Sequence, residues 1–420
     1  MKRSISLLLA MMLCLLAVSS AAESGEETDL LAAQTVEPGD AFPMATEPPA
    51  ETAADSAPDG QVFTPSFSSP YAGLDTTLNY WTLPMNIHDE ARIWKVLTSP
   101  ITVIDNGKGE RAQIILRAGP SKSSAGVGSL TCMTQGVHVL ERGAEWSLVE
   151  CYSSSFHDSA IVNWNRLVRG YVQTGYLKEV TPNQEMGLVV DKLTQRLYVF
   201  QNGKLFSTLL VSTGLPNAQQ PYNETRSGEF LLCSKVGTFD SDNMRCPMAI
   251  RFNRGDLLHE VPYVVYTDGT TNYKVTEPKL GTKASHGCIR VQRKMTPEGV
   301  NMSWIWKNYQ KNTRILIWED WQGRQMEIPA DDTPVYYNPK GGSSYHSQET
   351  CASTRQGVVL KAFPYGELDN GDFAELKRCE YCAPVLRKDE IAAINALYAP
   401  GGDHNPILTE ALQSCPRPKK

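Results

Sequence analysis

The sequence has little excess of either charge and, beyond its first residues, no long apolar run. Lysine and arginine number 40 against 46 acidic residues in a chain of 420, so the formal net charge is −6. This mild acidity argues against nucleic-acid binding, which depends on basic patches. A membrane-spanning helix needs roughly 20 apolar residues, and no later segment supplies them. Small-molecule and cell-wall substrates remain open.

Large apolar side chains are scarce in residues 23–75, which are instead rich in Ala, Glu, Thr, Pro, Ser and Gly. Such a stretch cannot bury enough surface to offset the entropy lost on ordering. It is therefore predicted to be a disordered linker. No internal repeat is evident along the chain.

The N-terminus has the three parts of a secretory signal. Lys2 and Arg3 are basic, Ile5–Val18 is apolar, and small residues follow at 19–22. The apolar run is too short for a spanning anchor, so residues 1–22 are predicted to be a cleaved signal peptide. The mature protein is then expected outside the cytoplasm, secreted or wall-associated, with no stable membrane insertion.

The chain has ten cysteines, and Cys14 lies within the signal. The remaining nine cannot all pair, so at least one free thiol is expected. A free thiol in an oxidising space is usually retained for its chemistry.

Residues 76–182 contain short alternating runs separated by turn signals, a pattern typical of a small barrel or sandwich. The predicted strands are 101–104, 113–116, 136–140, 146–149 and 170–172. Four short pieces of this segment together resemble a bacterial SH3-like domain, a kind of domain that often binds wall peptides or glycans. They are Leu116–Ser121, Gly136–Leu140, Trp146 and Gly170–Leu177. Cys132 and Cys151 would either form a disulfide across a hairpin or remain two buried thiols.

Residues 185–319 form a second β-rich segment of higher hydrophobicity. Strands are predicted at 187–191, 196–200, 204–213 and 313–318. Thr296 and Pro297 match the N-cap and first position of a helix that would run past Trp304 to Tyr309.

The strongest chemical signal is the run Gly281–Arg290, which reads GTKASHGCIR. A cysteine nucleophile needs a nearby base or cation. His286 would share a face with Cys288 in an extended segment. Gly287 permits close backbone approach, so the amides there would form an oxyanion hole. Arg290 offers a fixed charge for a carboxylate. The alternatives are a turn beside a buried thiol, or a His-x-Cys metal site.

The run Ala284–Arg290 resembles the active-site signature of the L,D-transpeptidases, the YkuD-type catalytic domain. Leu258–His259, Thr225–Phe230 and the hairpin 191–200 match the same family in the right order. The resemblance implies that Cys288 attacks the bond between a diamino acid and D-Ala in a wall stem peptide. It implies His259 as general base, His286 as support for the thiolate, and the amides of residues 287 and 288 as oxyanion donors.

Two departures from the family concern the acceptor side. The segment Val261–Leu280 is longer than usual, with Asp268-Gly269 as a turn, and Glu260 stands where a small residue is common. The Asn often found soon after Arg290 is also missing. These features put the acceptor site and the orientation of His259 in question more than the nucleophile.

The C-terminal segment, residues 333–397, contains a His-x4-Cys…Cys-x2-Cys set, namely His346, Cys351, Cys379 and Cys382. Three thiolates and one imidazole suit a closed tetrahedral zinc site. Disulfides are the alternative, with Cys415 as a fourth thiol.

The fold class predicted is mainly β: an SH3-like small barrel, a β-rich L,D-transpeptidase catalytic domain and a small Cys-rich module. The function predicted is cross-linking of peptidoglycan stem peptides through a cysteine acyl-enzyme. A carboxypeptidase with water as acceptor, and a non-catalytic wall-binding protein, are the alternatives. No cofactor is expected for catalysis, and a structural zinc is expected in the C-terminal module.

Overall fold

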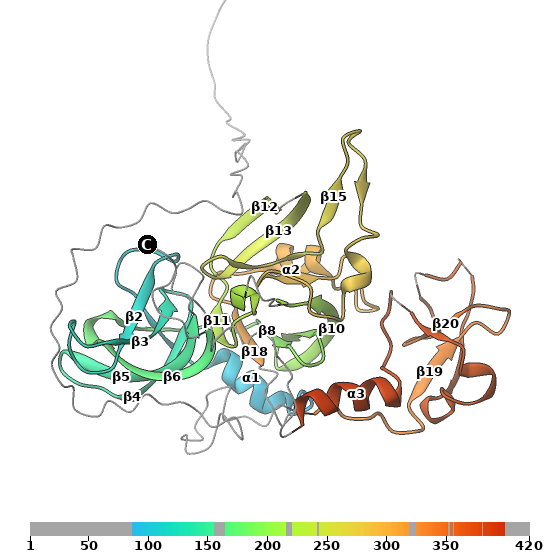
Figure 1. Ribbon diagram of the computed structural model, residues 1–420, viewed down its shortest axis with the longest axis horizontal. Coiled ribbons are helices and arrows are strands. Elements are labelled where there is room, and N and C mark those ends of the chain that lie inside the picture. Colours follow the sequence, from blue (N-terminus) through green and yellow to red (C-terminus); the bar gives the residue numbers. More distant parts are fainter. Residues whose placement is uncertain are drawn as a thin grey trace, which may run out of the picture. The chain divides into compact units, whose positions relative to one another are not determined.

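The computed structural model describes residues 86–154, 164–215, 221–241, 243–318 and 325–399 except 352, 356 and 380. The predicted signal peptide, the whole of the predicted linker and Cys415 lie outside these ranges. Within them the chain is mainly β and forms three sheets (Figure 1). No helix in the described part combines the length and apolarity needed to cross a bilayer.

The first sheet has seven antiparallel strands in the order β3-β2-β6-β5-β4-β1-β7. They are β1 (Ile101–Ile104), β2 (Gln113–Arg117), β3 (Gly126–Thr131), β4 (Gly136–Glu141), β5 (Trp146–Ser154), β6 (Trp164–Gln173) and β7 (Leu177–Val180). All five strands predicted from alternation are present. Cys132 and Cys151 are buried free thiols, so the disulfide alternative is wrong here. Whether this sheet is SH3-like stays a prediction.

A helix that was not predicted, α1 (Glu90–Thr98), precedes this sheet. Asp89 caps it by accepting from the backbone N–H of Arg92 at 3.3 Å. Its buried face, Ile93, Val96 and Leu97, packs in a cluster with Val189, Phe200 and Trp318 of the second sheet.

The second sheet carries the Cys288 motif. Its strand order is β11-β18-β8-β9-β10-β17-β14-β13-β15-β16, and β12 pairs with β13 as a hairpin (Figure 1). The strands are β8 (Met186–Asp191), β9 (Arg196–Gln201), β10 (Lys204–Ser212), β11 (Gly228–Leu231), β12 (Lys235–Ser241), β13 (Met244–Asn253), β14 (Asp256–Glu260), β15 (Tyr263–Val265), β16 (Thr271–Asn272), β17 (Ile289–Val291) and β18 (Arg314–Trp318). The long segment 261–280 therefore carries its own short hairpin.

The helix predicted to start at Thr296 begins later. Thr296 and Pro297 lie in a turn closed by the Gly299 N–H donating to the Thr296 carbonyl at 2.9 Å. The helix is α2 (Met302–Asn308), and Asn301 caps it by accepting from the Trp304 N–H.

The third sheet belongs to the C-terminal segment and has the order β21-β19-β20-β22. Its strands are β19 (Pro334–Tyr337), β20 (Ser344–His346), β21 (Lys361–Pro364) and β22 (Lys377–Arg378), and α3 (Lys388–Tyr398) follows. A small apolar cluster lies among them, made of Val335, Tyr345, Phe363, Tyr365 and Leu368.

Candidate active site

Two neighbouring strands carry the predicted base, His259, and Arg290 of the motif that contains Cys288. β17 pairs in parallel with β14, so that Arg290 lies opposite His259 and Ile289 lies opposite Leu258. Residues two apart on a strand share a face, and so do residues paired across a ladder. Arg290 and His259 therefore share a face. Cys288 lies in the bend directly before β17, and Arg290 acts electrostatically on both the Cys288 thiol and the His259 ring.

His259 is held as a neutral base. Its ring is 2 % exposed, and Nδ1 lies 2.7 Å from the Glu260 backbone carbonyl oxygen. A carbonyl can only accept, so Nδ1 carries the proton and Nε2 keeps a free lone pair. Burial, with a smaller contribution from Arg290, lowers the pKa of His259 to about 3. Phe239 from the β12–β13 hairpin packs edge-on against the ring at 5.4 Å between centroids.

Cys288 rests as a thiol. It is half-buried, with Sγ 3.9 Å from the Gly255 carbonyl oxygen. Burial first, and then the nearby Asp256 carboxylate, raise the pKa of Cys288 to about 12, although the Leu257 N–H and Arg290 act in the opposite direction. The thiol proton must therefore leave during attack rather than before it.

The residues before Cys288 form a bend, not the extended segment assumed from sequence. His286 is exposed on this bend, so the argument that placed it beside Cys288 by alternation is wrong. A catalytic role for His286 stays a prediction. The Gly287 N–H donates to Ser285 Oγ at 3.2 Å, and that hydroxyl donates to the Cys288 carbonyl at 2.5 Å. The Gly287 amide is thus engaged within the turn, which leaves the Cys288 N–H as the better candidate oxyanion donor.

Gly287 fits only as glycine. Its φ of +122° lies in a region that side chains disfavour, and a Cβ there would lie 2.5 Å from Asp256 Oδ1. Asp256 is itself fixed, since Arg226 Nη1 and Asn253 Nδ2 each donate to its Oδ2 at 3.2 Å.

Arg290 is buried, with 7 % of the residue exposed. Burial lowers the pKa of its guanidinium, and the thiols of Cys288 and Cys246 raise it in part. Cys246 comes from β13 and was not predicted to lie near the site. Nothing in its local sequence marks it, because its position depends on pairing between distant strands.

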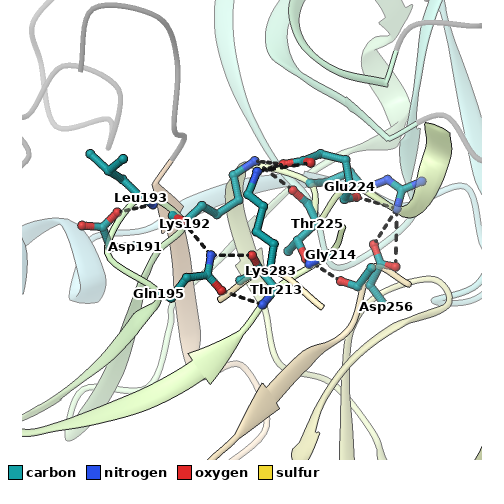
Figure 2. Close-up of polar contacts among 12 residues, drawn as sticks. Asp191, Lys192, Leu193, Gln195, Thr213, Gly214, Glu224, Thr225, Asp256 and Lys283 are labelled. Atoms are coloured by element: carbon teal, nitrogen blue, oxygen red, sulfur yellow. Dashed lines mark hydrogen bonds and ion pairs between the residues drawn. The ribbon is translucent and has the colours of Figure 1, made fainter. Parts of the chain in front are cut away.

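A buried polar network joins Lys192, Glu224, Thr225 and Lys283 (Figure 2). Lys192 Nζ donates to Glu224 Oε1 at 2.7 Å and to the Thr225 carbonyl at 3.1 Å. Lys283 lies 3.4 Å from the same carboxylate oxygen. Sequence reasoning missed this network and read residues 192–195 only as a turn. Lys192 directly follows the apolar strand β8, and a lysine at such a position could have indicated a buried ion pair.

The C-terminal segment holds a second cluster. The ligand atoms of His346, Cys351, Cys379 and Cys382 all lie within 4.8 Å of one another. Sγ of Cys351 and Cys379 are 3.8 Å apart, and Sγ of Cys382 lies 3.7 Å from His346 Nδ1. Four ligands at about 2.3 Å from a tetrahedral zinc would be separated by roughly 3.8 Å. The cluster can hold a metal ion, and its three thiols are free.

Comparison with known proteins locates the catalytic segment. The family model of the L,D-transpeptidase catalytic domain, YkuD, matches residues 185–317. YciB of Bacillus subtilis, whose description names L,D-transpeptidase as its candidate activity, is 29% identical over 128 residues, 29% of this chain and 60% of YciB. The chain thus spans about 60% of the length of that curated relative.

Solved structures of L,D-transpeptidases are also among the proteins that this chain matches. The L,D-transpeptidase from Mycobacterium smegmatis is 15% identical and is matched over 53% of this chain and 92% of its own, with a TM-score of 0.26. L,D-transpeptidase 3 from Mycobacterium tuberculosis, solved with a faropenem-derived adduct, is 15% identical over 44% of this chain and 98% of its own, with a TM-score of 0.25. Residues 185–317 therefore match the catalytic domain of the L,D-transpeptidases.

Proposed function

We propose that this protein is a peptidoglycan L,D-transpeptidase that cross-links stem peptides through an acyl-enzyme on Cys288. The observation that carries the proposal is the match of residues 185–317 to that family, and it is supported by the β14–β17 register, which pairs His259 with Arg290, two residues after Cys288. Arg290, buried beside the thiol, supports recognition of a substrate carboxylate.

The proposed reaction has two halves. In the first, His259 Nε2 takes the thiol proton as Cys288 Sγ attacks the carbonyl of the diamino acid that precedes D-Ala. The Cys288 N–H stabilises the oxyanion. Collapse forms a thioester, and the proton passes from His259 to the departing D-Ala amine. In the second half, an amine of another stem attacks the thioester, loses its proton to His259, and restores the thiol.

The test is incubation of the protein with purified muropeptides carrying a terminal D-Ala, followed by mass spectrometry. Dimers formed with loss of D-Ala support transpeptidation. Monomers that lose D-Ala and gain water indicate a carboxypeptidase instead. Cys288→Ala is the control and is expected to abolish both products. Unchanged muropeptides, or turnover in that variant, contradict the proposal.

We further propose that the C-terminal cluster binds a structural zinc through His346, Cys351, Cys379 and Cys382. Its support is the ligand set and the near-tetrahedral spacing of its atoms. Catalysis itself needs no cofactor in the proposed reaction.

The remaining domain assignments belong to the same proposal. Residues 76–182 would form an SH3-like domain that binds wall material, for which the antiparallel seven-stranded sheet is the support. Export by residues 1–22 would place the reaction at the cell wall.

A further inference from the structure

Thr225 connects two backbone segments. One contains Gly214 (Figure 2), and the other contains Gly287, the residue directly before Cys288. It is fully buried, and its hydroxyl makes two bonds of 2.8 Å, one with the Gly214 nitrogen and one with the Gly287 carbonyl oxygen. An amide N–H can only donate and a carbonyl can only accept. The Thr225 hydroxyl must therefore accept from Gly214 and donate to Gly287.

The bond to Gly287 fixes the orientation of the peptide that joins it to Cys288. A trans peptide is planar, so its carbonyl and its N–H point in opposite directions. With the Gly287 carbonyl directed at the buried Thr225 hydroxyl, the Cys288 N–H points in the opposite direction, away from Thr225. Gly287 itself has a φ of +122°, a backbone conformation that glycine accepts more readily than other residues.

The backbone of Thr225 is fixed by a contact with a buried ion pair. Lys192 binds both its carbonyl and the Glu224 carboxylate, and the side chains of that ion pair are 0 % and 1 % exposed. A buried ion pair tolerates few alternative geometries, because breaking it leaves a buried charge without a partner of opposite charge. The network thus gives the Thr225 hydroxyl a fixed position.

We propose that Thr225 is a positioning residue for acyl transfer, which aims the Cys288 N–H at the oxyanion formed when the thiol attacks a carbonyl. The inference rests on Cys288 being the nucleophile of the proposed function. It does not depend on which stem peptide is the substrate.

The experiment compares two reactions of the same thiol. Acylation by p-nitrophenyl acetate passes through a tetrahedral oxyanion, whereas alkylation by iodoacetamide displaces iodide at a saturated carbon and forms none. Cys288→Ala protein supplies the background from other thiols. Because one oxyanion donor is worth roughly 100- to 1,000-fold, Thr225→Val is expected to slow acylation by at least about tenfold. Alkylation should stay within about twofold of the wild-type rate.

Thr225→Ser keeps the hydroxyl and is the matched control, expected to retain most of the acylation rate. If Thr225→Val does not fold, Thr225→Ala makes the same comparison with a smaller side chain. Acylation and alkylation falling in parallel, or acylation unchanged, overturns the proposal, as does a wild-type Cys288 that is alkylated but never acylated. Wild-type protein that is acylated by the ester yet leaves muropeptides unchanged contradicts the proposed function and not this inference.

Discussion

At the residue scale, the site keeps its reactive pair uncharged. Burial raises the pKa of Cys288 to about 12 and lowers that of His259 to about 3. Between these values the thiol holds its proton and the imidazole lacks one, so no ion pair forms at rest. Oxidation follows thiolate character. A neutral resting thiol would therefore protect Cys288 from oxidation if the protein is exported as proposed.

The first prediction is the pH dependence of alkylation. The thiolate fraction grows as pH approaches the pKa of Cys288 from below, so its iodoacetamide rate should rise about tenfold per pH unit from pH 6 to 9. The rate is followed by intact mass, with Cys288→Ala as background. A preformed thiolate–imidazolium pair would instead give a flat profile over this interval, which would refute the neutral resting state.

The second prediction separates the two histidines. His259→Ala should lower acyl transfer by roughly 100- to 10,000-fold, the usual worth of a general base. His286→Ala should have a much smaller effect, because that side chain is exposed on the bend. Initial rates of muropeptide conversion, with circular dichroism to verify folding, decide between them. A severe loss in His286→Ala together with near-normal His259→Ala would reverse the assignment.

At the scale of elements, the bend that contains Gly287 and Cys288 depends on a backbone conformation at Gly287 that only glycine adopts easily. The third prediction is that Gly287→Ala destabilises the protein. A strained φ costs on the order of 1–3 kcal/mol, and the added methyl group would clash with the Asp256 carboxylate. Gly299→Ala is the control, because Gly299 also has a positive φ (+78°) but has no atom within 4 Å of the added Cβ.

Thermal denaturation of both variants should show a larger loss for Gly287→Ala, and only that variant should lose acyl transfer. Equal losses would mean that backbone strain alone matters and that the contact with Asp256 is unimportant.

Local signals explain which elements could be predicted. Short runs of apolar and β-branched residues predicted five strands of the first sheet and four of the second, but not β3, β7 or β11 to β17. The start of α2 was misplaced because Thr296 and Asn301 are both good caps, and only the turn closed at Gly299 decides between them. The helix α1 was not predicted, although Ile93, Val96 and Leu97 are spaced as on one face of a helix.

The site itself was predictable only in part, and for the same reason. Cys288 and Arg290 lie in one compact motif, and the structure pairs Arg290 with His259 of the upstream strand, whereas the catalytic roles of Cys288 and His259 stay predictions. The Thr225–Gly287 bond joins residues 62 apart, and the Lys192–Glu224 pair joins residues 32 apart. Such contacts depend on the folded sheet and leave no local pattern.

At the scale of the whole molecule, the C-terminal segment stands out for its small core. Its sheet surrounds one cluster centred on Val335, Tyr345 and Phe363. Small units of this size often need a disulfide or a metal to supplement limited apolar burial. The His346 cluster draws its ligands from β20, from the loop after it and from the Cys379–Cys382 turn, so a bound ion would tie three separate pieces of the segment together.

The fourth prediction concerns metal content. The purified protein should carry about one equivalent of zinc, because a closed site with three thiolates and one imidazole selects that ion. Cys379→Ser should lose the zinc. Cys233→Ser, which removes a thiol outside the cluster, should retain it and serves as the control. Elemental analysis measures both.

Removal of the metal distinguishes its structural role from a catalytic one. The unfolded chain has no preformed site, so the free energy of zinc binding contributes to folding of the segment. A chelator should therefore make residues 333–397 sensitive to protease while leaving alkylation of Cys288 unchanged, because none of the four ligands belongs to the Cys288 motif. The competing arrangement oxidises Cys351, Cys379, Cys382 and Cys415 into two bridges and needs no ion. Metal-free protein with a protease-resistant C-terminal segment and none of these thiols free would establish the bridges, since a zinc site requires the three cluster thiols to be reduced.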